Sequence, residues 1–143
     1  MSETVPSQSA EDYLERIHEL ITQKGYARVV DIADSLGVKQ ASVTSMVQRL
    51  GELGYLNYEK YRGLILTEKG RQVAHTIQHR HQILSRFFSL FNVAPDIQQR
   101  DIEGMEHHLS ADTVRLLSDL VTFFERHPTT LTKFQAERTP DKE

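Results

Sequence analysis

The sequence contains no cysteine and no long run of apolar residues. Without cysteine it can form neither a disulfide framework nor a thiolate metal site, which leaves carboxylate, imidazole, carbonyl and water as metal ligands. No stretch of 18 apolar residues is present, and no membrane-spanning helix is expected. Residues 1–6 lack the basic and apolar regions of a secretory signal. We therefore expect a cytoplasmic protein without a membrane partner.

Positive charge is also in deficit, because the sequence has 17 Lys and Arg but 20 Asp and Glu, which gives a net charge of −3. The charge is unevenly spread. Residues 24–80 hold nine Lys and Arg against five Asp and Glu, and the rest of the chain carries −7. The distribution of charge matters more than its sum for nucleic-acid binding, and a basic middle between acidic flanks is compatible with a DNA-binding segment. A length of 143 residues suits one compact domain or two small ones that share a core.

The patterns of common enzymes are missing as well. No nucleophile-and-base arrangement and no glycine-rich phosphate loop is present. Residues 15–18, Glu-Arg-Ile-His, match the Glu-x-x-His of ferritin-like dimetal enzymes, but such bundles require a second copy and two further glutamates. We therefore expect no enzyme; oxygen-dependent turnover with Fe²⁺ would indicate the dimetal alternative.

A helix-turn-helix pattern occupies residues 26–53. Helical spacing predicts a short helix over 30–36, a turn at residues 37–38 and a second helix over 40–53 with an apolar inward face. The predicted DNA-binding residues of this region are Arg28, Lys39, Gln40, Ser42, Ser45 and Arg49. Hydroxyl and amide side chains on the outward face suit a helix that enters the major groove. An ordinary polar helix face is the alternative interpretation.

A hairpin is predicted directly after this pattern. Two β-like runs, at 55–59 and 64–67, flank a tip in which Gly63 can take positive φ. A hairpin after a helix-turn-helix is a wing, and we expect Lys60 and Arg62 to reach phosphates or the minor groove. The sequence therefore predicts a winged helix-turn-helix domain over residues 1–71.

The flanking segments are helical in pattern. A first helix is expected to begin at Ser9 and to end at Gly25, and a long one to run from about 67 to 91. Two further helices follow, one from Pro95 to about His108 and one capped at Ser110. Their apolar surface fits either a dimer interface or packing on the long helix. The fold class is thus mainly α, with a helical second domain over residues 72–143.

Residues 103–108, Glu-Gly-Met-Glu-His-His, concentrate two carboxylates and two imidazoles. On a helix, residues three and four apart share a face, and Glu103, Glu106 and His107 would be presented together. Converging charged groups on a partly buried face need a cation to neutralise them, which makes this segment half of a divalent metal site. A solvated helix face is the alternative for this motif taken alone.

These pieces together resemble the diphtheria-toxin-repressor family of metal-dependent repressors, in its manganese transport regulator branch. The resemblance covers nearly the whole chain and rests on residues 11–15, 24–29, 58–64, 80–81 and 103–109. It implies a homodimer with a helical metal-binding and dimerisation domain, no SH3-like domain, and a palindromic operator in double-stranded DNA. The metal ligands that it implies are Asp12, Glu15, His81, Glu103, Glu106 and His107.

The same resemblance implies two metal ions per chain, with Glu15, Glu103 and Glu106 as bridging ligands, and leaves His18, His75, His79 and His108 outside the ligand set. Carboxylate-rich sites with imidazole suit Mn²⁺ without excluding Fe²⁺, Cd²⁺ or Zn²⁺. The function implied is Mn²⁺-activated repression of manganese-uptake genes. A winged-helix regulator that senses an organic ligand or Fe²⁺ remains the alternative.

Overall fold

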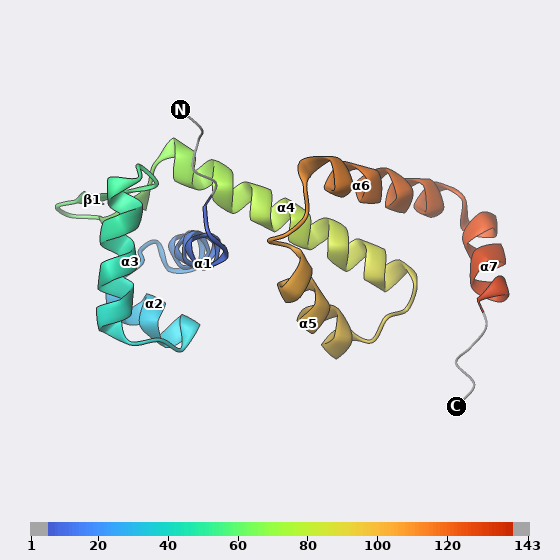
Figure 1. Cartoon of the computed structure of the whole chain (residues 1–143), viewed down its shortest axis with the longest axis horizontal. Helices are drawn as coiled ribbons and strands as arrows, with labels where there is room; N and C mark the ends of the chain where they lie inside the picture. Colours follow the sequence, from blue (N-terminus) through green and yellow to red (C-terminus); the bar gives the residue numbers. More distant parts are fainter. Residues whose placement is uncertain (1–5, 139–143) are drawn as a thin grey trace. The chain divides into compact units, whose positions relative to one another are not determined.

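The computed structural model describes residues 6–138, which form seven helices and one two-stranded hairpin (Figure 1). The predicted class, mainly helical with a small wing, is confirmed. The chain forms two compact units, Met1–Gln78 and His79–Glu143. The division falls inside the long helix α4, Glu68–Leu90, rather than at its start. None of the helices in this part of the chain is both long and apolar enough to cross a membrane.

The first unit begins with α1, Gln8–Lys24. The Ser7 side chain caps this helix by accepting a hydrogen bond from the Ala10 N–H at 3.1 Å, so the expected start at Ser9 is wrong by two residues. Gly25 ends it in the left-handed region, at φ 83°, as predicted. The helices α2, Val29–Leu36, and α3, Gln40–Glu52, follow and form the predicted helix-turn-helix.

The core of the first unit lies where α1, α2, α3 and the hairpin meet. Five of its side chains have no exposed surface: Leu14, Ile17, Ile32, Val43 and Leu50. Burial of such a side chain stabilises the fold by about 1.5–3 kcal/mol. The inward face of α3 is thereby fixed by packing, and the opposite face is left for solvent.

The wing is an antiparallel hairpin of β1, Leu56–Glu59, and β2, Gly63–Leu66. Gly63 takes φ +73° at the end of the tip, which confirms the predicted turn chemistry. Leu64 and Leu66 are buried in the core, while Tyr58, which pairs with Leu64 in the register, is 78% exposed. Paired residues share a face of the hairpin, so this face is anchored in the core through Leu64 and Leu66 and becomes open to solvent at Tyr58.

The start of α4 is tied to the wing. The Thr67 hydroxyl accepts a hydrogen bond from the Gly70 N–H at 3.1 Å and donates one to the Gly54 carbonyl at 2.6 Å. The Thr67 N–H also donates to the Tyr55 carbonyl at 3.0 Å. Gly70 allows this close approach, because a Cβ at that position would lie 2.2 Å from the Tyr55 carbonyl oxygen.

The second unit comprises the rest of α4 with α5, Pro95–Met105, α6, Ala111–Arg126, and α7, Pro128–Glu137. Ser110 caps α6 by accepting from the Thr113 N–H at 3.2 Å. The core of the unit contains Ile83, Leu84, Ile102, Val114 and Val121. Phenylalanines of α4, α6 and α7 pack edge to face around Phe91 and hold α7 in place.

Candidate metal centre and nucleic-acid interface

The outward face of α3 carries the predicted recognition residues. All of Lys39, Gln40, Ser42, Ser45 and Arg49 are exposed, whereas Val43 and Leu50 point into the core. The helix begins at Gln40, and Lys39 stands at its N-cap position. Donor and acceptor side chains are therefore presented along one exposed side of a helix that the core holds rigidly, as major-groove reading requires.

The tip of the wing adds two cations and one aromatic ring. Arg62 lies 3.6 Å from Glu59, and the Lys60 ammonium lies 5.7 Å from the centre of the Tyr61 ring. Tyr61 is 91% exposed. The sequence prediction named both cations but not Tyr61, although an exposed aromatic residue beside basic ones is a recognisable signal of nucleic-acid contact.

Arg28, at the N-cap of α2, is exposed but already has partners. Its Nε donates to the Asp31 carboxylate at 3.2 Å, and its guanidinium lies 4.8 Å from the centre of the Tyr26 ring. The hydrogen bond to Asp31 raises the pKa of Arg28 above its ordinary value. Arg28 is thus a preoriented cation beside the helix-turn-helix.

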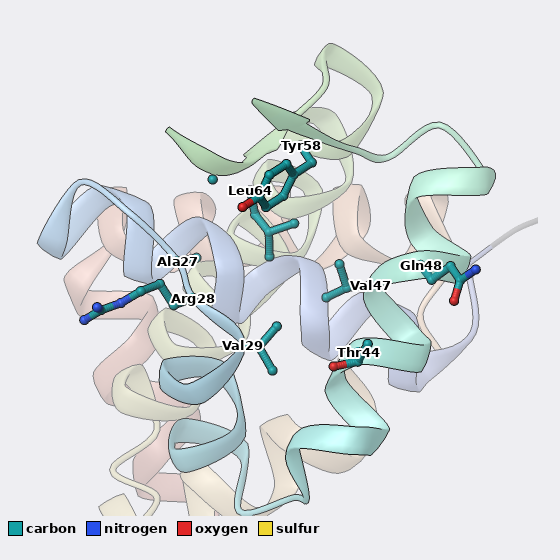
Figure 2. A pocket seen from close by; sticks show the side chains of 9 residues that line it. Ala27, Arg28, Val29, Thr44, Val47, Gln48, Tyr58 and Leu64 are labelled. Carbon is teal, nitrogen blue, oxygen red and sulfur yellow. The ribbon is translucent and has the colours of Figure 1, made fainter. Parts of the chain in front are cut away.

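A pocket of about 370 Å³ lies between α3 and the wing (Figure 2). Figure 2 shows Thr44, Val47 and Gln48 of α3 on one side and Tyr58 and Leu64 of the hairpin on another. Three polar residues that line the pocket are absent from the predicted DNA-binding set: Thr44, Gln48 and Tyr58. The surface of α3 that is open to a ligand therefore extends toward the wing beyond the predicted set.

Three of the predicted metal ligands meet in the second unit. The Nδ1 atom of His81 lies 3.2 Å from one carboxylate oxygen of Glu106, and the Nε2 atom of His107 lies 3.6 Å from the other. The side chains of Glu106 and His107 are 5% and 3% exposed, and that of His81 is 50% exposed. A buried carboxylate is thus flanked by two imidazoles, one of which is open to solvent.

The motif is positioned by a turn rather than by a continuous helix. α5 ends at Met105, and residues 106–108 form a turn, so the helix predicted to reach His108 is shorter than expected. The Glu106 carbonyl accepts a hydrogen bond from Arg80 at 3.2 Å, which ties the turn to α4. Glu103 is exposed whereas Glu106 is buried. Glu106 keeps helical φ and ψ, and its N–H donates to the Ile102 carbonyl at 2.9 Å, so the two carboxylates retain helical spacing but differ in burial, and their joint role as ligands stays a prediction.

Asp12 and Glu15 lie on α1 of the first unit, where both are half-buried. Within residues 6–138 no three histidine, aspartate or glutamate side chains are gathered closely enough to hold an ion. The six-ligand set therefore stays a prediction, of which the structure brings together His81, Glu106 and His107.

Comparison with known protein families matches both parts of the chain. Residues 7–64 match the family described as iron dependent repressor, N-terminal DNA binding domain, and residues 67–135 match its metal binding and dimerisation domain. The HTH-type transcriptional regulator MntR of Listeria monocytogenes serotype 4a is 50% identical over 97% of this chain and 98% of its own length. The chain belongs to the iron-dependent repressor family. The predicted family and regulator type, and the absence of enzyme function, are confirmed.

Two further relatives are consistent with this assignment. The MntR of Geobacillus kaustophilus is 50% identical over 85% of this chain and 86% of its own length. The solved structure of the manganese regulator SloR is 26% identical with a TM-score of 0.71, over 84% of this chain. The chain spans about 55% of SloR. It is thus a metal-dependent transcriptional regulator of the MntR type, with a DNA-binding and a dimerisation domain.

Proposed function

We propose that this protein is an Mn²⁺-activated repressor of manganese-uptake genes that acts in the cytoplasm as a homodimer on a palindromic operator. The observation that carries the proposal is the buried Glu106 carboxylate, which lies between His81 and His107. It occurs in a chain whose sequence is 50% identical to an MntR regulator. The proposal adds to the family assignment the identity of the metal, its ligands and the direction of regulation.

The donor chemistry fits a divalent cation. A buried carboxylate is costly unless it is paired, and imidazole is a side chain that commonly binds metal ions. Together, the proposed ligands offer five histidine or glutamate side chains and one aspartate: Asp12, Glu15, His81, Glu103, Glu106 and His107. When bound, Mn²⁺ supplies the positive charge that such a carboxylate-rich set lacks. We propose two ions per chain, with Glu15, Glu103 and Glu106 as the shared ligands.

The proposed ligands are divided between the two units of the chain. Asp12 and Glu15 belong to α1, which packs in the core beneath the helix-turn-helix, and the other four belong to the dimerisation unit. The free energy of metal binding can then depend on the state of the DNA-binding unit. A coupling of this kind typically amounts to about 1–3 kcal/mol, or a 5–150-fold change in DNA affinity.

The DNA contacts that we propose lie on α3 and the wing. The outward residues of α3 would read base edges, and Lys60 and Arg62 would contact phosphates or the minor groove. Two such units in a symmetric dimer would meet half-sites about 34 Å apart, one turn of B-DNA.

The dimer is supported by an apolar stripe on α6. Leu116, Leu120 and Phe123 are 65%, 38% and 46% exposed, and their spacing of four and three residues places them on one side of the helix. An exposed stripe of large apolar side chains is typical of a protein interface. We propose that a second copy of the chain covers it.

In the decisive experiment, fragmented genomic DNA is bound to immobilised metal-stripped protein in parallel samples that contain Mn²⁺, Fe²⁺, Zn²⁺, Cd²⁺ or chelator. The DNA that each sample retains is then sequenced. The proposal expects enrichment of a short palindrome near manganese transporter genes in the Mn²⁺ arm. Equal retention with Mn²⁺ and with chelator would contradict metal activation. Equilibrium dialysis of the same protein should give two Mn²⁺ per chain, and a single ion would contradict the bridged pair.

A further inference from the structure

Two histidines outside the predicted ligand set meet within the DNA-binding unit. His18 is on α1 and His75 is on the first part of α4, 57 positions later in the sequence. Their ring centroids lie 5.1 Å apart, with an angle of 64° between the ring planes. His18 is half-buried and His75 is exposed. A contact between two imidazoles from separate helices therefore lies at the edge of this unit, open to an ion from solvent.

The separation of the rings is the one that a shared metal ion would require. A histidine nitrogen binds Zn²⁺ at about 2.0–2.1 Å, which places the ring centroid about 3.2 Å from the ion. Two rings at a tetrahedral angle are then about 5.2 Å apart between centroids. The observed 5.1 Å agrees with this value, so the two rings are close enough to share an ion once one nitrogen of each is turned toward it.

The surroundings of His18 keep its imidazole in the form that binds metal ions. Burial, and then the neighbouring His75, lower the pKa of His18 below its ordinary value, while Glu19 opposes the shift. His18 is therefore neutral at pH 7, and the neutral imidazole is the form that binds metals. Glu68 interacts electrostatically with His75. Glu19 is paired with Arg16 at 3.2 Å and Glu68 with Arg71 at 2.7 Å, which leaves the imidazoles as the available ligands.

We propose that His18 and His75 form a two-histidine site for a borderline transition-metal ion, Zn²⁺ above all, separate from the manganese ligands proposed above. Water would complete the coordination. Imidazole suits Zn²⁺, Cu²⁺ and Ni²⁺, whereas Mn²⁺ prefers oxygen ligands and stands lowest in intrinsic affinity. The site would tie α1 to α4 and would respond to metals other than the one that the regulator senses. It does not depend on the proposed function being correct.

The test is Zn²⁺ binding to the full-length protein, measured by equilibrium dialysis and calorimetry in the Glu106→Gln background, which weakens the proposed manganese site. We expect His18→Gln and His75→Gln each to lower the affinity of one Zn²⁺ by roughly tenfold or more, since changes behind a metal ligand already cost that much. The double variant should lose no further Zn²⁺. Circular dichroism checks that each variant folds.

His79→Gln is the matched control, because His75 and His79 stand four apart on α4 and such a pair can chelate an ion alone. We expect this variant to bind Zn²⁺ like the parent. Loss of the ion in His75→Gln and His79→Gln but not in His18→Gln would overturn the proposal, as would unchanged binding in all variants. Cu²⁺ provides a spectroscopic readout: electron paramagnetic resonance should show two coordinated nitrogens, and one in either single variant.

Discussion

The Nδ1 atom of His81 lies 3.2 Å from a carboxylate oxygen of Glu106, although 25 positions separate the two residues. His81 is on α4 and Glu106 is in the turn that follows α5. Glu106 itself keeps helical φ and ψ, with its N–H bonded to the Ile102 carbonyl at 2.9 Å, and the chain departs from the α5 helix only after it. The hydrogen bond from Arg80 to the Glu106 carbonyl holds the turn against α4.

Glu106→Gln should remove Mn²⁺-dependent DNA binding while the protein stays folded. Glutamine has nearly the same volume and can still hydrogen-bond to His81, but it lacks the negative charge that a cation requires. We expect a loss of the whole metal effect on DNA affinity, in a range of 5–150-fold. Fluorescence anisotropy of labelled operator with and without Mn²⁺ measures it.

Glu125→Gln is the control for that variant. Glu125 is an exposed carboxylate of α6 that pairs with Arg86, and a surface ion pair of this kind contributes about 1 kcal/mol at most. We expect its response to Mn²⁺ to match the wild type. A normal Mn²⁺ response in Glu106→Gln would remove Glu106 from the ligand set.

Glu103→Ala should also abolish metal-activated DNA binding, because Glu103 is a proposed metal ligand. Glu103 is exposed on α5, and its truncation removes no buried contact. The apo protein should therefore unfold at the same urea concentration as the wild type, and only its affinity for Mn²⁺ should fall. Isothermal titration with Mn²⁺ checks this, and unchanged Mn²⁺ binding would show that Glu103 is not a ligand.

Arg62→Ala should weaken DNA binding about equally for operator and unrelated sequences. A phosphate contact carries no sequence information. Each such contact that is lost makes the plot of log association constant against log salt concentration less steep by about 0.9. Arg62 is 74% exposed and its pair with Glu59 is loose, so no loss of stability is expected. Lys133→Ala, an exposed cation of α7 in the dimerisation unit, should leave the slope unchanged. An unaltered slope in Arg62→Ala would remove it from the phosphate contacts.

The parts of the fold that were predictable are those with local causes. The inward face of α3 shows as an apolar repeat, and the wing shows as two short β runs around Gly63, whose φ of +73° few other residues adopt. Helical spacing indicated Glu103, Glu106 and His107, whereas the other three ligands came from the resemblance to a family. The structure brings together His81, Glu106 and His107.

The parts that were not predictable depend on contacts between distant residues. Ser7 and Ser9 are equally good helix caps by residue type, and the structure uses Ser7. No glycine or proline directly follows Met105 to mark the end of α5, and the hydrogen bond from Arg80 to the Glu106 carbonyl comes from a helix 26 positions earlier. The contact between His18 and His75 joins residues 57 positions apart, and no periodicity signals it.

Gly70→Ala should destabilise the DNA-binding unit. A Cβ there would lie 2.2 Å from the Tyr55 carbonyl oxygen and 3.2 Å from a Leu66 methyl group, and a backbone oxygen cannot move aside cheaply. We expect a loss of about 1–3 kcal/mol in the free energy of unfolding, measured by urea titration with circular dichroism. Gly51→Ala, inside α3, is the matched control: its Cβ would meet only the Leu56 carbonyl oxygen at 3.8 Å, and helix propensity should then stabilise the protein by about 0.5–1 kcal/mol. Equal stability of the two variants would show that the junction of wing and α4 yields to an added methyl group, and that the close approach at Gly70 does not fix the wing.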